Sequence, residues 1–247
     1  MAVNPVIICD LDEAVQSLPD LISKTGFKLE TVHLALVKPN LCGLYHPSLR
    51  LLSSIIEFLM SFADSVVIGE TRSMMHDPDE QFQRLGVNAL LKEYAGRVKA
   101  VDLSDDQSVK VRVPNPHALR ELTLPKTILD SDVLVNLPKV GTHSTTRLTC
   151  ALKNLFGLLP QKHKYLRYHP LGMSNVIADI AQVVKSDLNI VDGGSKVILG
   201  LDALVVDIVA CRFLNLDPLR VEHLRLVSED RGEKLEAFLR KIKVVEI

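Results

Sequence analysis

Short aliphatic runs alternate with segments of helical periodicity along most of this chain. Strands buried on both faces are continuous aliphatic runs, and strands joined through helices pair in parallel. The sequence therefore predicts a three-layer α/β fold, with helices on both faces of a mainly parallel sheet. The expected strands are Val3–Cys9, Val32–Val37, Ser65–Ile68, Val98–Leu103, Val109–Val113, Val133–Leu137, Leu188–Val191 and Val244–Ile247. The expected helices are Leu11–Ser23, Pro47–Phe62, Pro78–Leu85, Asn88–Tyr94, Ser144–Phe156, Gly172–Lys185, Ala203–Leu214 and Val221–Gly232.

The chain has the length of one large domain. Its 247 residues can bury a substantial core, and no linker or repeat divides them. We expect a single α/β domain over residues 1–247. The stretch Val109–Pro125 alternates apolar and polar residues and predicts an antiparallel excursion, so that residues 104–130 can form a small lobe.

Charge and hydropathy exclude several classes of protein. The net charge of −1 provides no basic surface for nucleic acid or an anionic membrane. No apolar run approaches the roughly 20 residues of a membrane-spanning helix. The first residues lack a basic leader followed by an apolar stretch, which favours a cytoplasmic protein.

The four cysteines, at positions 9, 42, 150 and 211, are far apart in the sequence. None belongs to a Cys-x-x-Cys pair, so the local iron–sulfur and zinc-ribbon signatures are missing. We expect buried free thiols and no iron–sulfur cluster. The glycine-rich loops of dinucleotide and nucleoside-triphosphate sites are also missing, as is the Gly-x-Ser-x-Gly nucleophile elbow.

The most informative segment joins the expected strand Val133–Leu137 to a helix. Pro138 ends the strand, and either Ser144 or Thr145 is a suitable cap for a helix that continues to Phe156. Open α/β folds bind ligands at the carboxyl edge of the sheet, where such a junction lies. Several cationic or titratable residues gather there and predict an anionic ligand: Lys139, His143, Arg147 and Lys153.

Polar residues follow three other expected strands. Lys38 and Asn40 follow Val37, Glu70 and Arg72 follow Ile68, and Asp192 follows Val191. Carboxyl ends of neighbouring parallel strands converge, so we expect one cleft lined by Lys38, Glu70, Lys139, His143, Lys153 and Asp192.

A purely structural interpretation is also possible for these residues. The polar residues after a strand can be ordinary turns, and Glu70 can pair with Arg72 on the surface. Lys153 can be a solvated helix residue. Asp202 is placed to cap the helix that begins at Ala203, whereas Asp207 lies in an apolar run and requires a partner if it is buried.

Several short motifs together resemble the domain-of-unknown-function family 362. They are Lys38-Pro39-Asn40, Gly69-Glu70, Pro138-Lys139-x-x-Thr142-His143, Thr149-x-x-x-Lys153-Asn154-Leu155-Phe156-Gly157 and Asp192-Gly193. The resemblance extends from about Val32 to Pro218. It differs after Asp192-Gly193, where relatives have a longer glycine-rich loop. Members are often fused to ferredoxin-type modules, which implies a ferredoxin-type protein partner for this chain.

A more distant resemblance is to lactate racemase and its relatives. His143, Lys153 and His169 have the order His-x9-Lys-x15-His. The resemblance implies Lys153 as the tether of a nickel-pincer nucleotide, His169 as the metal ligand and His143 as an acid/base. A histidine of that family is replaced here, because the segment is Gly69-Glu70-Thr71-Arg72.

These observations lead to two alternative functions. The first is an enzyme, racemase- or isomerase-like or redox-active, that performs proton or hydride transfer on a small carboxylate or phosphate compound. In it His143, Lys153 and Glu70 are catalytic, Lys153 and His169 bind a cofactor, and the substrate contacts Lys38, Asn40, Arg72, Lys139, Arg147 and Asp192. The second is a non-catalytic accessory protein that works with a ferredoxin-type partner.

Overall fold

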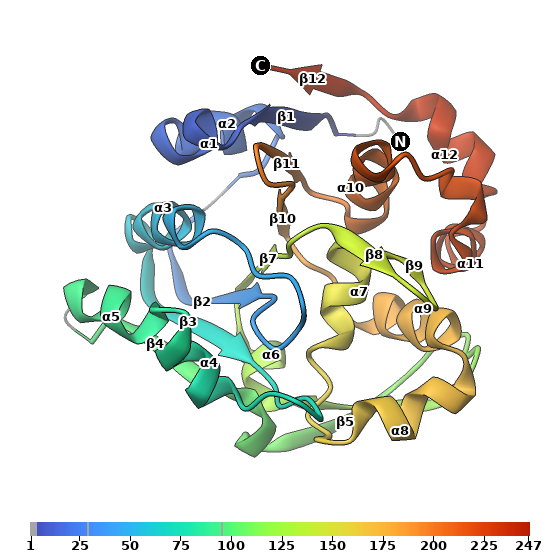
Figure 1. The fold of residues 1–247 in the computed structure, drawn as a ribbon, viewed down its shortest axis with the longest axis horizontal. Helices are drawn as coiled ribbons and strands as arrows, with labels where there is room; N and C mark the ends of the chain where they lie inside the picture. Colours follow the sequence, from blue (N-terminus) through green and yellow to red (C-terminus); the bar gives the residue numbers. More distant parts are fainter. Residues whose placement is uncertain (1–3, 29, 95) are drawn as a thin grey trace.

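An eight-stranded sheet forms the centre of the computed structural model, which describes residues 4–28, 30–94 and 96–247 (Figure 1). The strands lie in the order β12-β1-β11-β10-β7-β2-β3-β4. Their bounds are β1 (Val6–Asp10), β2 (Val32–Pro39), β3 (Ala63–Glu70), β4 (Val98–Asp102), β7 (Val133–Leu137), β10 (Leu188–Asp192), β11 (Lys196–Gly200) and β12 (Val244–Glu246). β11 is antiparallel to β1 and β10, whereas the other neighbouring pairs are parallel. The mainly parallel sheet is confirmed.

Helices cover both faces of this sheet (Figure 1). One face packs against α1 (Leu11–Gln16), α2 (Leu18–Lys24), α3 (Leu49–Met60), α4 (Pro78–Arg84) and α5 (Val87–Leu91). The other packs against α7 (Ala151–Phe156), α9 (Met173–Val183), α10 (Ala203–Ala210), α11 (Glu222–Asp230) and α12 (Leu235–Lys241). Further helices are α6 (Lys126–Asp130) and α8 (Lys164–Tyr168).

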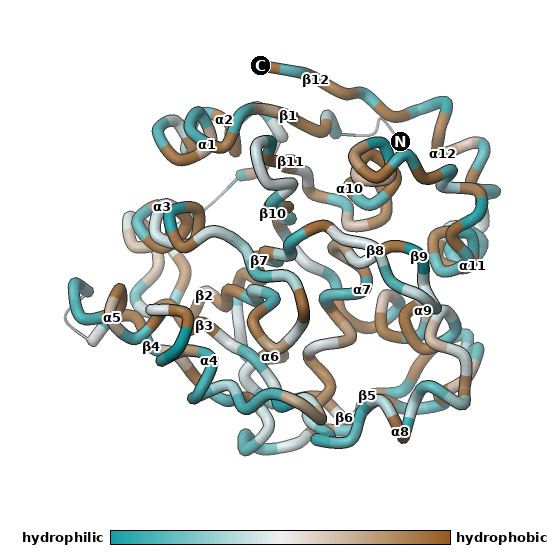
Figure 2. The backbone as a smooth tube through the Cα atoms, viewed as in Figure 1, coloured by the Kyte–Doolittle hydropathy of each residue, from teal (hydrophilic) through white to brown (hydrophobic). Residues whose placement is uncertain are grey.

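Successive side chains of each strand point to opposite faces of the sheet, so each strand contributes to the core on both sides. On β7, Val133 and Val135 pack into the first layer and Leu134 into the second. Brown apolar segments accordingly line the interior on both sides of the sheet in Figure 2. Strands buried on both faces have to be apolar at nearly every position, which is why they are continuous aliphatic runs in the sequence.

Two small antiparallel pairs lie outside the main sheet. β5 (Ser108–Arg112) pairs with β6 (Glu121–Pro125), as the alternation in this stretch predicted. Leu122 and Leu124 of β6 belong to the same apolar cluster as Leu36 and Leu134 of the main sheet. β8 (Gly141–His143) pairs with β9 (Arg147–Thr149) directly before α7.

The helix expected to begin at Ser144 is wrong in its first turns. Ser144, Thr145 and Thr146 form the loop of the β8–β9 hairpin, and α7 begins only at Ala151. Arg147 has a left-handed φ of 63°, which fits a three-residue hairpin loop followed by a left-handed residue. Serine and threonine serve such turns as readily as they cap helices.

The cap of α7 comes from a distant part of the chain. Cys150 holds the N-cap position without a side-chain cap bond. Asp207 of α10 instead accepts hydrogen bonds from the backbone N–H groups of Ala151 at 2.7 Å and Leu152 at 3.1 Å. This is the partner that the buried Asp207 required, and Asp202 caps α10 as expected.

Other boundaries differ from the prediction. Val3, the expected start of the first strand, lies outside the described residues, and β1 begins at Val6. The helix expected over Leu11–Ser23 divides at Ser17 into α1 and α2. β11 was not expected, and neither were α6, α8 and α12. In the described parts of the chain, no helix has the length and apolarity needed to cross a membrane.

Candidate functional site

A cavity of about 240 Å³ lies where β2, β3 and β7 reach the carboxyl edge of the sheet. The loops after β2 and β3, the β8–β9 hairpin, α7 and α8 form its wall. Of the residues predicted for a common cleft, the structure brings Lys38, Glu70, His143 and Lys153 onto this wall. Asn40, predicted to contact the substrate, also lies on it. We call it the carboxyl-edge cavity.

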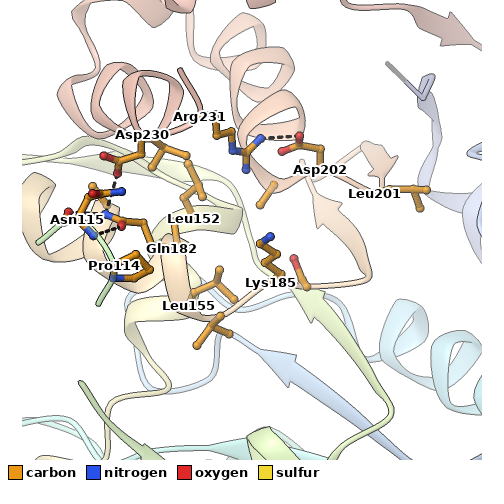
Figure 3. Close-up of a pocket in the computed structure, with 16 residues that line it drawn as sticks. Pro114, Asn115, Leu152, Leu155, Gln182, Lys185, Leu201, Asp202, Asp230 and Arg231 are labelled. Atoms are coloured by element: carbon orange, nitrogen blue, oxygen red, sulfur yellow. Dashed lines mark hydrogen bonds and ion pairs between the residues drawn. The ribbon is translucent and has the colours of Figure 1, made fainter. Parts of the chain in front are cut away.

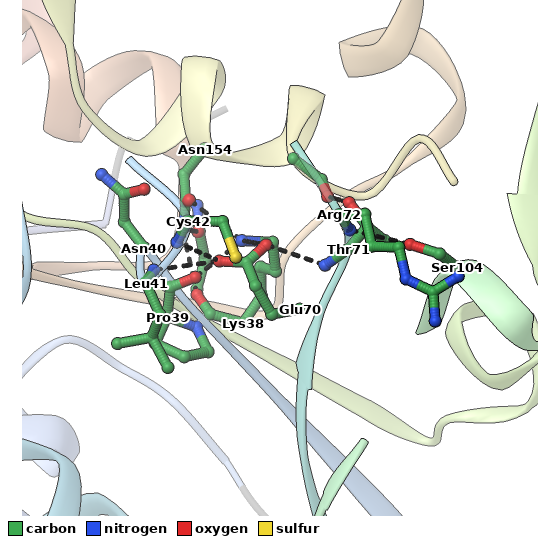
Figure 4. Close-up of polar contacts among 12 residues, drawn as sticks. Lys38, Pro39, Asn40, Leu41, Cys42, Glu70, Thr71, Arg72, Ser104 and Asn154 are labelled. Carbon is green, nitrogen blue, oxygen red and sulfur yellow. Dashed lines mark hydrogen bonds and ion pairs between the residues drawn. The ribbon is translucent and has the colours of Figure 1, made fainter. Parts of the chain in front are cut away.

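Lys38 and Glu70 form an ion pair at the base of this cavity (Figure 4). The Lys38 Nζ–Glu70 Oε1 distance is 2.9 Å, and the two side chains are 1% and 2% exposed. Glu70 also accepts hydrogen bonds from the N–H groups of Leu41 at 2.9 Å and Thr71 at 3.0 Å. The pair therefore fixes the loop after β2 against the end of β3.

Buried asparagines connect the same lysine to the interior of the sheet. Asn154 of α7 accepts from Lys38 Nζ at 3.2 Å, and its Nδ2 donates to Lys38 O at 3.0 Å and to Asn136 Oδ1 at 2.8 Å. Asn136 of β7 donates in turn to Asn189 Oδ1 of β10 at 2.9 Å. A Cβ atom at Gly157 would lie 2.9 Å from the backbone oxygen of Asn154 and 3.0 Å from Lys38 Nζ, so only glycine fits here without a shift. Each polar group is thus held in one position.

Two further lysines of the cavity wall differ from Lys38 because neither forms an ion pair with a carboxylate of the described residues. Desolvation by burial lowers the pKa of Lys153 to about 8. It also lowers the pKa of Lys164, on α8, to about 8, although Glu70 acts in the opposite direction. Lys164 Nζ donates hydrogen bonds to Thr71 Oγ1 and, at 3.4 Å, to Gly157 O. Glu70 is the one carboxylate on the described wall and is already paired with Lys38, so positive charge remains in excess.

His143 is held in a defined tautomer. Its Nδ1 accepts from the backbone N–H groups of Thr145 at 3.2 Å and Thr146 at 3.3 Å, so the proton of the neutral ring is on Nε2. Burial, then the charge of Lys153, lowers the pKa of His143 to about 4. At neutral pH this side chain is a neutral hydrogen-bond donor on the cavity wall.

The other predicted site residues are not part of the wall. Arg72 binds carboxylates of Asp102 (Nε–Oδ2 2.7 Å) and Asp105 (Nη1–Oδ1 2.8 Å), instead of Glu70. Lys139 Nζ lies 2.6 Å from Asp192 Oδ1, and this buried carboxylate also accepts from the N–H group of Ser48 at 2.7 Å. These pairs connect loops of the sheet edge to one another.

Arg147 and His169 also lie off the wall. Arg147 is exposed on the hairpin. His169 Nε2 lies 3.2 Å from Thr145 Oγ1, and its ring is 4.4 Å from the ring of Tyr165.

Lys164 is difficult to identify from the sequence because it lies in a short helix between two loops. The basic and aromatic residues around Lys164 are the one indication in the sequence, because basic side chains in such a segment can bind phosphate. Cys42 and Tyr45 of the loop after β2 are also on the wall. Burial raises the pKa of the Cys42 thiol well above its usual range, so it is not a thiolate at neutral pH.

The nickel-pincer arrangement fits these residues only in part. The lowered pKa of Lys153 suits an amine that attaches a cofactor. His169, the implied metal ligand, does not line the cavity. Within the described ranges, no three His, Cys, Asp or Glu side chains are grouped as metal ligands are.

The sequence of the region that builds this cavity matches a known family model. The model of the family described as a domain of unknown function (DUF362) matches residues 35–197. The chain belongs to the DUF362 family. A thylakoid-associated protein of Synechocystis sp. is 30% identical over 134 residues, which cover 48% of this DUF362 chain and 42% of the relative.

Two solved structures share the fold. The lactate racemase apoprotein from Thermoanaerobacterium thermosaccharolyticum has a TM-score of 0.50 and 14% identity over 84% of this chain and 56% of its own. A protein of Thermotoga maritima has a TM-score of 0.50 and 10% identity over 83% of this chain and 58% of its own. The chain thus spans less than half of the Synechocystis relative and a little over half of the two solved proteins. The distant resemblance to lactate racemase is confirmed as a likeness of fold.

Proposed function

We propose that the carboxyl-edge cavity binds a small carboxylate- or phosphate-bearing molecule and that Lys153 exchanges a proton with it. The observation that carries this proposal is the excess of positive charge on a partly buried wall. Lys153 and Lys164 face the cavity without a carboxylate partner among the described residues, while Lys38 is neutralised by Glu70. An anion placed there compensates the desolvation of both amines.

The protonation states support proton transfer by Lys153. With a pKa of about 8, its amine is present in both forms near neutral pH, as an acid/base group requires. The neutral amine takes a proton from the carbon next to the substrate carboxylate and becomes an ammonium group. Returning a proton to the same carbon completes an exchange, an isomerisation or a racemisation.

His143 has a different role in this proposal. Because its pKa is about 4, it remains neutral at pH 7 and donates from Nε2 to an oxygen on which negative charge develops. Thr142 and Thr149, which also line the cavity, supply hydroxyl groups for orienting the ligand. This division of roles is typical of a racemase- or isomerase-like enzyme.

Calorimetric titration with oxalate and with inorganic phosphate tests the anion site. We expect Lys153→Met and Lys164→Met each to weaken binding on the order of tenfold, because each removes a charged hydrogen-bond donor. The matched control is Lys162→Met, which changes an exposed lysine of the same loop. Equal affinities for wild type and Lys153→Met would contradict the proposal, and no binding of either anion would favour the accessory role.

Deuterium exchange tests the chemistry. Small carboxylic acids with a hydrogen on the carbon next to the carboxylate are incubated with the protein in heavy water, and incorporation is measured by mass spectrometry. We expect incorporation with wild type and Lys162→Met but not with Lys153→Met. Incorporation at the wild-type rate by Lys153→Met would assign the proton transfer to another group.

A further inference from the structure

A second cavity lies at the opposite edge of the sheet, beside the start of β10 and the end of the antiparallel β11 (Figure 3). Its volume is about 540 Å³, compared with about 240 Å³ for the carboxyl-edge cavity. Small-molecule sites typically enclose roughly 300–1,000 Å³. We call this the amino-edge cavity, and nothing in the proposed function uses it.

Apolar side chains from three helices form one part of its wall. Leu152 and Leu155 come from α7, Ala178 and Ala181 from α9, and Val227 from α11. Alanine at positions 178 and 181 keeps the side chains of α9 short on this part of the wall. A wall of this kind accommodates an apolar body of moderate size.

Polar side chains on the same wall are mostly satisfied by one another. Arg231 Nη1 lies 2.6 Å from Asp202 Oδ2. Gln182 Nε2 donates to Asp230 Oδ2 at 3.0 Å and to Asn115 O at 2.8 Å. Figure 3 shows these contacts bridging separate elements around the cavity. They join α9 to α11 and to the β5–β6 loop, so the cavity is formed before any ligand arrives.

Lys185 is the exception on this wall. It follows α9, is exposed, and forms no hydrogen bond or ion pair with the residues that the structure describes. In Figure 3 its amine is directed into the space between Leu152 and the Asp202–Arg231 pair. Asp202 and Asp230 already have partners, whereas Lys185 has none among the described residues, so an anion is the group to which its ammonium can donate.

We propose that the amino-edge cavity is a binding site for an amphipathic anion, with its apolar body against Leu152, Leu155 and Ala181 and its carboxylate at Lys185. The site is separate from the carboxyl-edge cavity, and its test does not depend on the proposed function. Decanoate is the probe, because it combines a flexible apolar chain with a single carboxylate. Decanol, which has the same chain length without the charge, isolates the contribution of Lys185.

Calorimetry on the full chain measures both probes below their aggregation limits. We expect wild type to bind decanoate at least tenfold more tightly than decanol, since the charged contact is made only by the acid. Lys185→Met should remove this preference. Ala181→Phe should weaken both probes at least tenfold because the ring occupies the cavity, whereas Ala89→Phe, on an exposed helix position elsewhere, should bind as wild type does.

Two results would overturn the site. One is the absence of decanoate binding to wild type, and the other is equal decanoate affinity for wild type, Ala181→Phe and Lys185→Met. Circular dichroism confirms that each variant is folded. Lys185→Glu changes an exposed residue and reverses the charge, so it tests the anion contact even if Ala181→Phe does not fold.

Discussion

The Lys38–Glu70 pair illustrates how single residues determine the state of the carboxyl-edge cavity. Both side chains are almost completely buried, and each has further hydrogen-bond partners in the backbone. Burying two charges costs much of what their attraction provides, but removing one partner leaves the other charge uncompensated. The pair therefore matters most for holding the loop after β2 in place.

Replacing Glu70 by Ala should destabilise the protein strongly. The expected loss in the free energy of unfolding is about 3–5 kcal/mol, because Lys38 is left charged and buried without a counter-ion. Urea denaturation of wild type and variant measures it. Glu57→Ala, at an exposed position of α3, should change stability by less than about 0.5 kcal/mol. A similarly small effect for Glu70→Ala would show that the pair is not formed.

The pKa of Lys153 predicts how anion binding depends on pH. Below about pH 8 its amine is protonated and attracts an anion, and above that pH it is neutral. Lys164 loses its proton in the same range. Oxalate carries a constant charge from pH 7 to 10, so its affinity should fall on the order of tenfold or more over this interval. Calorimetric titration at several pH values measures the change.

The double variant Lys153→Met and Lys164→Met provides the control for this pH dependence. Its oxalate affinity should be weak and nearly independent of pH between 7 and 10. A wild-type affinity that stays constant over this range would contradict the assignment of the two lysines as the anion-binding groups.

At the level of elements, α7 depends on a residue 56 positions away in the sequence. The helix is short, and its first N–H groups are satisfied by Asp207 of α10. Burial raises the pKa of Asp207 to about 7, although the two N–H donors favour its charged form. The folded protein thus retains this proton to about pH 7, whereas an unfolded aspartic acid loses it near pH 3.8. Its contribution to stability consequently decreases as pH rises from about 4 to 7.

Asp207→Ala should lower the free energy of unfolding by about 2–4 kcal/mol, because two buried N–H groups lose their acceptor. Chemical denaturation at pH 7 tests this. Asp217→Ala removes an exposed carboxylate that accepts from the Leu219 N–H group, and it should lower the free energy of unfolding by about 1 kcal/mol or less. Asp207→Asn cannot titrate, so its stability should fall less than that of wild type between pH 4 and 7. Identical pH profiles would contradict the raised pKa.

The strands and helices differ in how well the sequence predicts them. β2, β3 and β7 are found because burial on both faces requires aliphatic residues throughout. β11 is missed because the tight turn before it, from Gly193 to Ser195, has the composition of a longer loop. The start of α7 is predicted wrongly because its cap, Asp207, is distant in sequence and Ser144 and Thr145 offer a local alternative.

For the whole molecule, topology explains which site residues were found. Lys38 and Glu70 meet because β2 and β3 are parallel and end at the same edge, and His143 joins them because it follows β7, which also ends there. Arg72 and Lys139 lie at that edge too, but their carboxylate partners cannot be identified from local sequence. Lys164 reaches the cavity from a loop-like segment without periodicity, so only tertiary structure places it there.

The position of α7 between the two cavities predicts that they are coupled. Leu152 and Leu155 line the amino-edge cavity, and Lys153 and Asn154 line the carboxyl-edge cavity. A ligand that restrains one side of this short helix lowers the ordering cost of binding on the other side. We therefore expect saturating decanoate to tighten oxalate binding by about fivefold.

Linkage makes this prediction testable in both directions, because oxalate must tighten decanoate binding by the same factor. Calorimetric titrations of each ligand in the presence of the other provide both numbers. Ala181→Phe should bind oxalate with one affinity whether or not decanoate is present, since its amino-edge cavity is filled. If the two ligands bind independently in wild type, α7 does not couple the two cavities. The separate binding tests of each cavity are unaffected by that result. Because reciprocity holds for any two single sites, unequal factors in the two directions would show that one of the probes occupies more than one site.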